Sequence, residues 1–369
     1  MKDRAHGGDV FHASSVTGIP VGEIVDFSAS INPLGMSGKA AAAAKNALGV
    51  VHHYPEPFAG RLAEKIVESF SARRSQIIPG NGSTELIYLL PRALKPETVL
   101  VHNPTFSEYE RAALLAGAAI KTVAGTEAGL SGLWFDFARF AEAVRGAEMA
   151  FLCNPNNPTG ELLEMGMVLE LAREAKKARC FLVVDEAFID FCPGFSLAEE
   201  AAKGKNPYLI VLRSMTKFHA LTGLRAGYAI FGSARVASEV LRFKEPWSIN
   251  TPAEEAAIAA LDDAGHARES LLFMEKEKKF MARGLEKAGV CFFTKGANGA
   301  NGGGPGPNFF FIRLPGAQKF IGRLFRKGVL VRDCSNFKGC EGGGVIRFAV
   351  KRRPENVLLL NEIKKWAGV

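Results

Sequence analysis

Between residues 80 and 230, the chain alternates short apolar runs with longer amphipathic stretches. Three of these stretches space their apolar residues as helices do: Ser107–Leu115, Asp136–Val144 and Glu164–Ala178. Six apolar runs have the length of strands: Thr98–His102, Ala118–Val123, Glu148–Cys153, Cys180–Asp185, Leu209–Arg213 and Ala226–Phe231. This alternation predicts an α/β fold with a mainly parallel sheet covered by helices. In such sheets ligands bind beyond the carboxyl ends of the strands, so the loops there are expected to carry the chemistry.

Residues 246–369 follow a different pattern. One or more long helices are expected from Pro252 to about Ala288, followed by short strands at Phe309–Leu314 and Val345–Val350. This mixture predicts a second, smaller α+β domain. A glycine-rich stretch at 296–307 is expected to form an irregular surface loop, with no assigned role.

The predicted division of the chain has three parts. Residues 1–48 form an N-terminal arm and part of the small domain, 49–247 the large domain, and 248–369 the rest of the small domain. A chain of 369 residues is long enough for two domains.

Composition is that of an ordinary soluble enzyme, with 47% hydrophobic and 23% charged residues. No secretory signal and no apolar run of roughly 20 residues is visible, so we expect a cytoplasmic protein without a membrane span. The net charge is +8, but cations alternate with acids, as in Glu275–Lys279, which is typical of a solvated helix face. No nucleic-acid partner is therefore predicted, and the excess of cations suits anionic ligands.

The six cysteines contain no CxxC pair, which argues against a zinc ribbon or a disulfide framework. Cys334 and Cys340 are the closest pair. Reduced thiols are favoured there over a metal site, and no metal is predicted.

Lys217 lies in a string, Ser214–Tyr228, that follows an apolar strand. The hydroxyl of Ser214 three residues before it and the guanidinium of Arg225 eight after it suit an amine that forms a Schiff base beside an anchored phosphate. Neighbouring cations and burial keep part of such an amine neutral and nucleophilic. The alternative is a solvated surface charge, which most lysines are.

A second loop, Gly80–Glu85, opens a helical pattern. Gly82 lets the backbone approach an anion, and the Ser83 and Thr84 hydroxyls and the helix N-terminal amides donate to it. The alternatives are a simple helix cap and a dinucleotide site, although Glu85 replaces the last glycine of that fingerprint.

Three further residues have functional and ordinary interpretations. Asp185 ends a buried strand, where a carboxylate is costly without a cation such as a protonated pyridine nitrogen; otherwise it is an ordinary strand-end acid. Asn157, in the turn-rich run Asn154–Gly160, is a well-oriented donor or part of a plain turn. Phe106 either stacks on a flat ring or belongs to the core.

Together these loops resemble the fold-type I, pyridoxal-phosphate-dependent enzymes of the class I/II aminotransferase superfamily, over nearly the whole chain. The resemblance implies that Lys217 binds the cofactor as a Schiff base and that Asp185 pairs with its ring nitrogen. It implies that Asn157 bonds the 3-oxygen and Phe106 stacks on the ring. The 5′-phosphate would be held by Gly82, Ser83, Ser214 and Arg225.

Two more residues acquire roles from the resemblance. Tyr54 matches a tyrosine that reaches the cofactor phosphate from the other subunit, which implies a homodimer. Arg347 matches the arginine that binds a substrate carboxylate through two hydrogen bonds. One position departs from the pattern: Phe188 stands where many relatives have a tyrosine, and it cannot donate a hydrogen bond.

Finer motifs resemble the threonine-phosphate decarboxylases of this superfamily: His6–Gly8, Asp26–Gly35, Gly80–Ser83, Asp185–Phe191 and Val331–Phe337. The implied reaction converts L-threonine O-3-phosphate into (R)-1-amino-2-propanol O-2-phosphate and carbon dioxide, in cobalamin synthesis. Asn32 and Arg347 would aim the substrate carboxylate, and His6 and Arg332 would bind its phosphate, although a lone N-terminal histidine is usually just solvent-exposed. Gly7 and Asn157 are also expected to contact the substrate.

Two alternatives remain open. Histidinol-phosphate aminotransferase shares the fold, the cofactor and a phosphorylated amine substrate. A non-catalytic cofactor-binding regulator is more remote, because no residues remain for a nucleic-acid-binding domain and Lys217 is retained. The preference between phosphothreonine and phosphoserine is not readable from the sequence.

Overall fold

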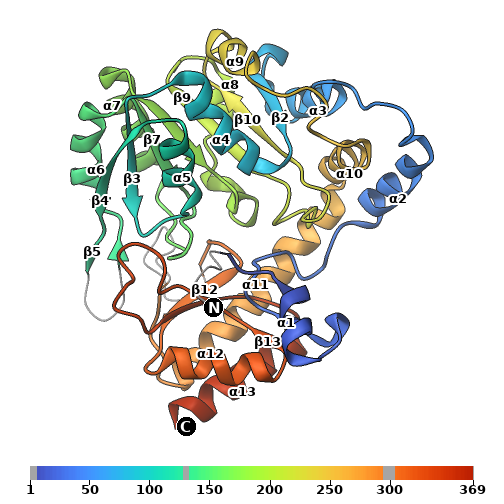
Figure 1. Ribbon diagram of the computed structural model, residues 1–369, viewed down its shortest axis with the longest axis vertical. Helices are drawn as coiled ribbons and strands as arrows, with labels where there is room; N and C mark the ends of the chain where they lie inside the picture. The colour runs from blue at the N-terminus through green and yellow to red at the C-terminus, as the bar shows by residue number, and fades with distance from the viewer. Residues whose placement is uncertain (1–5, 128–132, 294–303, 369) are drawn as a thin grey trace.

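The computed structural model describes residues 6–127, 133–293 and 304–368 (Figure 1). A larger body surrounds a seven-stranded sheet, and a smaller body holds both chain ends; α11 (Ala264–Lys287) runs between the two. Residues 296–303 of the predicted glycine-rich loop lie outside the described part of the chain.

The large sheet contains all six predicted strands, each within one residue of its expected ends. Its order is β2 (Ile77–Gly80), β10 (Gly227–Phe231), β9 (Leu209–Ser214), β8 (Phe181–Asp185), β7 (Met149–Cys153), β3 (Thr98–Asn103) and β4 (Ala119–Ala124). β10 runs antiparallel to both of its neighbours, β2 and β9, and all the other strand pairs in this sheet are parallel. The predicted fold class is confirmed, and β2 is the one strand of this sheet that the sequence pattern missed.

Both faces of the sheet are buried, which explains why its strands are apolar at nearly every position. In β7, Ala150 and Leu152 point to one helical layer, while Met149 and Phe151 point to the other. The first layer contains α3 (Gly60–Phe70), α6 (Phe137–Ala143), α7 (Met165–Ala178) and α8 (Ala198–Ala202). The second contains α4 (Gly82–Leu94), α5 (Glu108–Leu115) and α9 (Ala234–Leu241).

Two helices pack with the first layer although the predicted boundaries place them outside the large domain. They are α2 (Gly38–Ala47) and α10 (Thr251–Leu261), which lie against each other and join the same buried cluster. The predicted boundaries at 48 and 247 assign these two helices to the small domain, whereas their buried residues pack in the core of the larger body. The rest of that division stays a prediction.

The smaller body is built on a four-stranded antiparallel sheet in the order β11 (Phe292–Phe293), β12 (Phe309–Arg313), β15 (Val345–Ala349) and β14 (Arg332–Asp333). It is covered by α11, α12 (Ala317–Arg326) and α13 (Arg353–Ala367). The N-terminal segment joins it through α1 (Val10–Thr17), which touches α12, and through β1 (Val25–Asp26), which pairs with β13 (Val329–Leu330). Two short strands, β5 (Thr126–Glu127) and β6 (Leu133–Trp134), pair with each other in antiparallel orientation.

The expectation of a solvated face at Glu275–Lys279 is wrong for two of its five residues. Glu277 and Lys278 are buried, because that face of α11 packs against α13 and the loop before β12. Glu277 accepts hydrogen bonds from Arg353 and Asn356, which compensate its burial. Among the described helices, none is both long and apolar enough to cross a membrane.

Candidate active site

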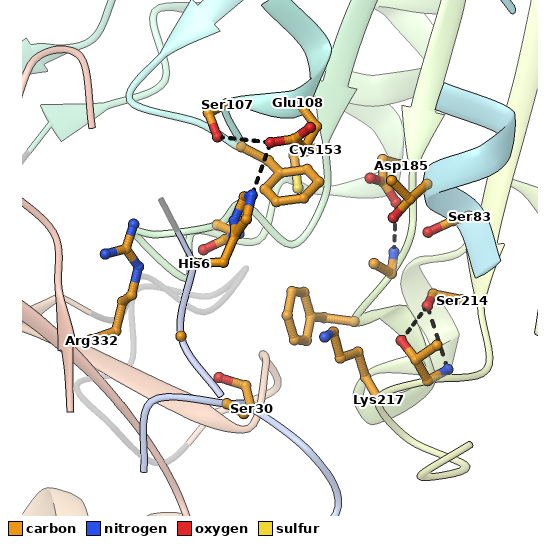
Figure 2. A pocket seen from close by; sticks show the side chains of 18 of the residues that line it. His6, Ser30, Ser83, Ser107, Glu108, Cys153, Asp185, Ser214, Lys217 and Arg332 are labelled. Carbon is orange, nitrogen blue, oxygen red and sulfur yellow. Dashed lines mark hydrogen bonds and ion pairs between the residues drawn. The ribbon is translucent and has the colours of Figure 1, made fainter. Parts of the chain in front are cut away.

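A cavity of about 320 Å³ lies beyond the carboxyl ends of β7, β8 and β9, between the two bodies (Figure 2). It brings together twelve of the predicted site residues: His6, Gly7, Ser83, Thr84, Phe106, Asn157, Asp185, Ser214, Lys217, Arg225, Arg332 and Arg347. Gly82 lies directly beside it, because a Cβ there would meet Arg225. Asn32 and Tyr54 are not part of its lining.

Lys217 lies in the loop that follows β9, at the carboxyl edge of the sheet, and its side chain lines the cavity. Burial, together with the positive charges of Arg347 and Arg225, lowers the pKa of the Lys217 amine to about 8. Part of the amine is therefore neutral near pH 7, which a carbonyl nucleophile requires.

Asp185 closes β8 and is only 2% exposed. The Tyr109 hydroxyl donates to one of its carboxylate oxygens at 2.6 Å, and the Ala187 amide donates to the other at 3.1 Å. Burial nevertheless raises the pKa of Asp185 to about 6, with these bonds and the charge of Lys217 opposing the rise. The site thus holds a carboxylate that a cation in the cavity would stabilise.

Hydrogen-bond donors surround a hollow at the start of α4, here called the cofactor cup. Gly82 has φ 76°, and a Cβ at this position would lie 2.6 Å from Nη2 of Arg225, so only glycine allows this approach. Ser83 and Thr84 follow in the first turn of the helix, whose free amides suit an anion. Across the cup, the hydroxyls of Ser214 and Thr216 lie 2.8 Å apart.

Arg347 lies in the middle of β15 and is buried. One guanidinium nitrogen donates to the Asn157 side-chain oxygen, and the other donates to the Ser28 carbonyl at 2.9 Å. Burial lowers the pKa of Arg347 to about 10. Because the Asn157 oxygen accepts from Arg347, the amide nitrogen of Asn157 is the group left to donate elsewhere.

A second cationic group, Arg332, is the cross-strand partner of Arg347 and lies on the cavity wall across from Lys217 (Figure 2). Arg332 in β14 donates to the Asn336 side chain at 2.8 Å and lies 5.1 Å from the Phe337 ring centroid. His6 lines the same wall, with its ring 5.7 Å from that of Phe106. Lys217, Ser83 and Ser214 lie on the other side of the cavity.

Two predicted residues, Asn32 and Tyr54, lie outside the cavity lining. Asn32 is buried, but its side chain bonds the Phe218 carbonyl, Ser270 and the Leu34 amide, so nothing remains to aim a carboxylate. Its expected contact with substrate is corrected to a structural role. Tyr54 is 85% exposed, with its ring 5.2 Å from that of Trp247, away from the cavity of its own chain.

The sequence reasoning missed several residues that line the cavity, among them Ser28, Glu108, Tyr109 and Thr216. Glu108 and Tyr109 directly follow the Phe106 motif, and Thr216 precedes Lys217, so nearness to recognised motifs was the available signal. Phe188 also lines the cavity, where its ring meets Phe309 edge-on at 5.1 Å.

These residues fit pyridoxal 5′-phosphate, the cofactor that the sequence resemblance implies. The cup around Gly82 and Arg225 suits its phosphate, the buried Asp185 carboxylate suits its ring nitrogen, and the partly neutral Lys217 amine suits its aldehyde. Among the described residues, no group of three or more His, Cys, Asp or Glu side chains is placed so that it could hold a metal ion. All six cysteines are free, and Cys334 and Cys340 share an apolar cluster with Phe337.

Comparison with known proteins gives a consistent picture. Residues 22–360 match the family Aminotransferase class I and II. The chain is 31% identical to the threonine-phosphate decarboxylase of Salmonella typhimurium, over 98% of this chain and 96% of that protein. It is 32% identical to a histidinol-phosphate aminotransferase of Symbiobacterium thermophilum, over 85% and 83%. The solved histidinol-phosphate aminotransferase from Clostridium acetobutylicum superposes with a TM-score of 0.83 at 28% identity, covering 94% of this chain and 99% of that one.

Proposed function

The chain belongs to the aminotransferase class I and II family and is a pyridoxal 5′-phosphate enzyme, and from this premise we propose that it is a decarboxylase. Its substrate would be L-threonine O-3-phosphate, and its products (R)-1-amino-2-propanol O-2-phosphate and carbon dioxide, in cobalamin biosynthesis.

The observation that carries this proposal is the presence of two neighbouring cationic positions beyond the cofactor cup. Arg347 lies beside Asn157, and its cross-strand partner Arg332 lines the cavity together with His6. A substrate with one carboxylate and one phosphate would occupy both positions. Arginine suits each group, because its planar fork of donors matches carboxylate and phosphate oxygens.

The cofactor end would be organised around the chain's own donors. Lys217 would hold the cofactor covalently, Asp185 would pair with its ring nitrogen, and Asn157 would donate to its 3-oxygen. Gly82, Ser83, Thr84, Ser214 and Arg225 would surround its phosphate, and Phe106 would cover its ring. When bound, the cofactor supplies an electron sink for charge that develops at the substrate α-carbon.

Orientation would select the bond that breaks. Arg347 would bind the substrate carboxylate and hold its bond to the α-carbon perpendicular to the cofactor ring, where cleavage is favoured. The Lys217 amine would then deliver a proton to the α-carbon after carbon dioxide has left. Phe188, an apolar ring on the cavity wall, would add no competing proton donor.

A homodimer is part of the proposal. Tyr54 is too exposed to serve the cavity of its own chain, and an exposed tyrosine is free to reach a partner's site. We expect its hydroxyl to bond the cofactor phosphate of the other subunit.

The test is a paired assay. Purified protein given L-threonine O-3-phosphate should release carbon dioxide with no keto acid present. The second candidate, histidinol-phosphate aminotransferase, is favoured by the structural likeness to the Clostridium acetobutylicum enzyme. Glutamate formation from histidinol phosphate and 2-oxoglutarate, or the reverse reaction, without carbon dioxide release from phosphothreonine, would establish that reading instead.

A further inference from the structure

Glu108 is a nearly buried carboxylate in the cavity that the proposed mechanism leaves without a role. It lies in the first turn of α5, and its side chain is 8% exposed. One carboxylate oxygen lies 2.9 Å from Nε2 of His6 (Figure 2). The other accepts the Tyr88 hydroxyl, with Nη1 of Arg111 3.7 Å away.

Glu108 thereby holds one end of the N-terminal arm, residues 6–8, against the large body. The other end is fixed on Ser28, whose hydroxyl accepts the Gly8 amide at 2.8 Å. A Cβ at Gly7 would lie 2.6 Å from the Ser28 carbonyl oxygen, so the arm can lie this close only with glycine there. The arm is therefore attached at two points on either side of the cavity wall.

The second point of attachment is shared with the carboxylate-binding arginine. The Ser28 carbonyl that approaches Gly7 also accepts Nη2 of Arg347 at 2.9 Å. Ser28 itself is held by Asp26, which accepts both its amide and its hydroxyl hydrogens. The positions of His6 and Arg347 are therefore coupled through Ser28.

The bond to Glu108 also decides which atom of His6 faces a ligand. Nε2 is occupied by the carboxylate, so only Nδ1 remains for another partner, and it donates when the ring is protonated. The negative charge of Glu108 would repel a phosphate if it stood alone. Shared among His6, Tyr88 and Arg111, it acts as a partner that orients the imidazole ring.

We propose that Glu108 is a positioning residue, which fixes His6 and closes the N-terminal arm over the cavity so that the imidazole meets the phosphate of a phosphorylated amine substrate. The identity of that ligand class rests on the proposed function. The positioning itself does not depend on which bond of the substrate is cleaved.

The test compares a phosphorylated with an unphosphorylated ligand on the cofactor-loaded protein. In Glu108→Gln, affinity for L-threonine O-3-phosphate should fall about tenfold or more, because a charge-assisted hydrogen bond is lost. Affinity for L-threonine should be unchanged, and kcat should change much less than KM. His6→Ala should show the same selective loss, and the double variant no further loss, because both substitutions break one interaction.

Two further measurements separate positioning from a general structural effect. Exchange of the Gly8 amide hydrogen should become faster in Glu108→Gln, since the arm loses one attachment. Tyr88→Phe, which leaves Glu108 in place, should show a weaker loss in the same direction. The control is Glu239→Gln, which removes an ion-paired surface carboxylate remote from the cavity and should change neither affinity.

Equal losses for both ligands, or additive effects of Glu108→Gln and His6→Ala, would overturn the proposal. Failure of the proposed reaction looks different. The unsubstituted protein would then release no carbon dioxide, while a selective loss of affinity for histidinol phosphate in Glu108→Gln would still support the role of Glu108.

Discussion

The two ends of the cavity are built in different ways. The cofactor end takes Ser83, Asp185, Ser214, Lys217 and Arg225 from a helix start, strand ends and a loop at one edge of a single sheet. The substrate end is assembled from the N-terminal arm, α5, β14 and β15, which come together only when the smaller body and the arm dock on the large sheet. The cofactor end is thus fixed by strand order, whereas the substrate end depends on the relative placement of separate parts.

The largest expected effect tests the cofactor end. In Lys217→Ala, turnover should fall by about 10³-fold or more, because the covalent attachment and a proton carrier are both lost. After borohydride reduction, the mass of the variant should lack the cofactor that the unsubstituted protein retains. Retained turnover would refute the assignment of Lys217.

The next effect should be confined to the substrate end. Arg347→Lys replaces a planar fork by a single point charge, and truncating such a buried pairing costs about 2–5 kcal/mol. We expect kcat/KM for the phosphorylated substrate to fall on the order of 10²-fold, with cofactor absorbance unchanged. Arg313→Lys, at an exposed position of the paired strand β12, is the matched control. Loss of the cofactor in the Arg347 variant would contradict the separation of the two ends.

A pH titration tests whether the Asp185 carboxylate helps to bind the cofactor. The pKa of Asp185 is raised to about 6, so the carboxylate becomes protonated as pH falls through that value and can no longer pair with a ring cation. In Lys217→Ala, which removes the competing titration of the amine, noncovalent cofactor affinity should fall about tenfold between pH 7 and pH 5. Calorimetry at several pH values measures this, and an affinity that rises on acidification would contradict the assignment.

The same raised pKa has a consequence for folding. The folded protein binds the Asp185 proton more tightly than the unfolded chain does, so this group contributes stability at acid pH that is lost as pH rises towards about 6. Cofactor binding and apoprotein stability should therefore respond to Asp185 with opposite signs.

The smallest expected effect concerns the partner subunit. Tyr54→Phe should weaken cofactor binding about three- to tenfold, the contribution of one hydrogen bond, and leave the proposed dimer intact. Sedimentation with cofactor titration checks both. An unchanged affinity would leave Tyr54 without its proposed role.

Much of the fold was predictable because it rests on local patterns. The apolar runs of β3, β7, β8 and β9 are bounded by turn formers and alternate with amphipathic helices, so both the strands and their shared edge followed from the chain. β2, with the sequence Ile77-Ile78-Pro79-Gly80, was missed because it is short and contains proline and glycine.

Errors arose where a side chain's partner is distant in sequence. Glu277 and Lys278 look like a solvated charge run, yet Glu277 is bonded by Arg353 and Asn356 of α13, and buried Lys278 donates to the Gly304 carbonyl. Asn32 was expected at the substrate, yet its amide bonds Phe218 and Ser270, which lie 186 and 238 residues away along the chain. Local composition carries no information about such contacts.

The sequence by itself determined the element order, the strand-end loops and, through their resemblance to a family, the cofactor. The tertiary structure decided which groups meet: Tyr109 with Asp185, Asn157 with Arg347, and Glu108 with His6. The physical reason is range. Propensity and periodicity act over a few residues, whereas burial, hydrogen bonding and charge pairing act between any groups that packing brings within a few ångströms.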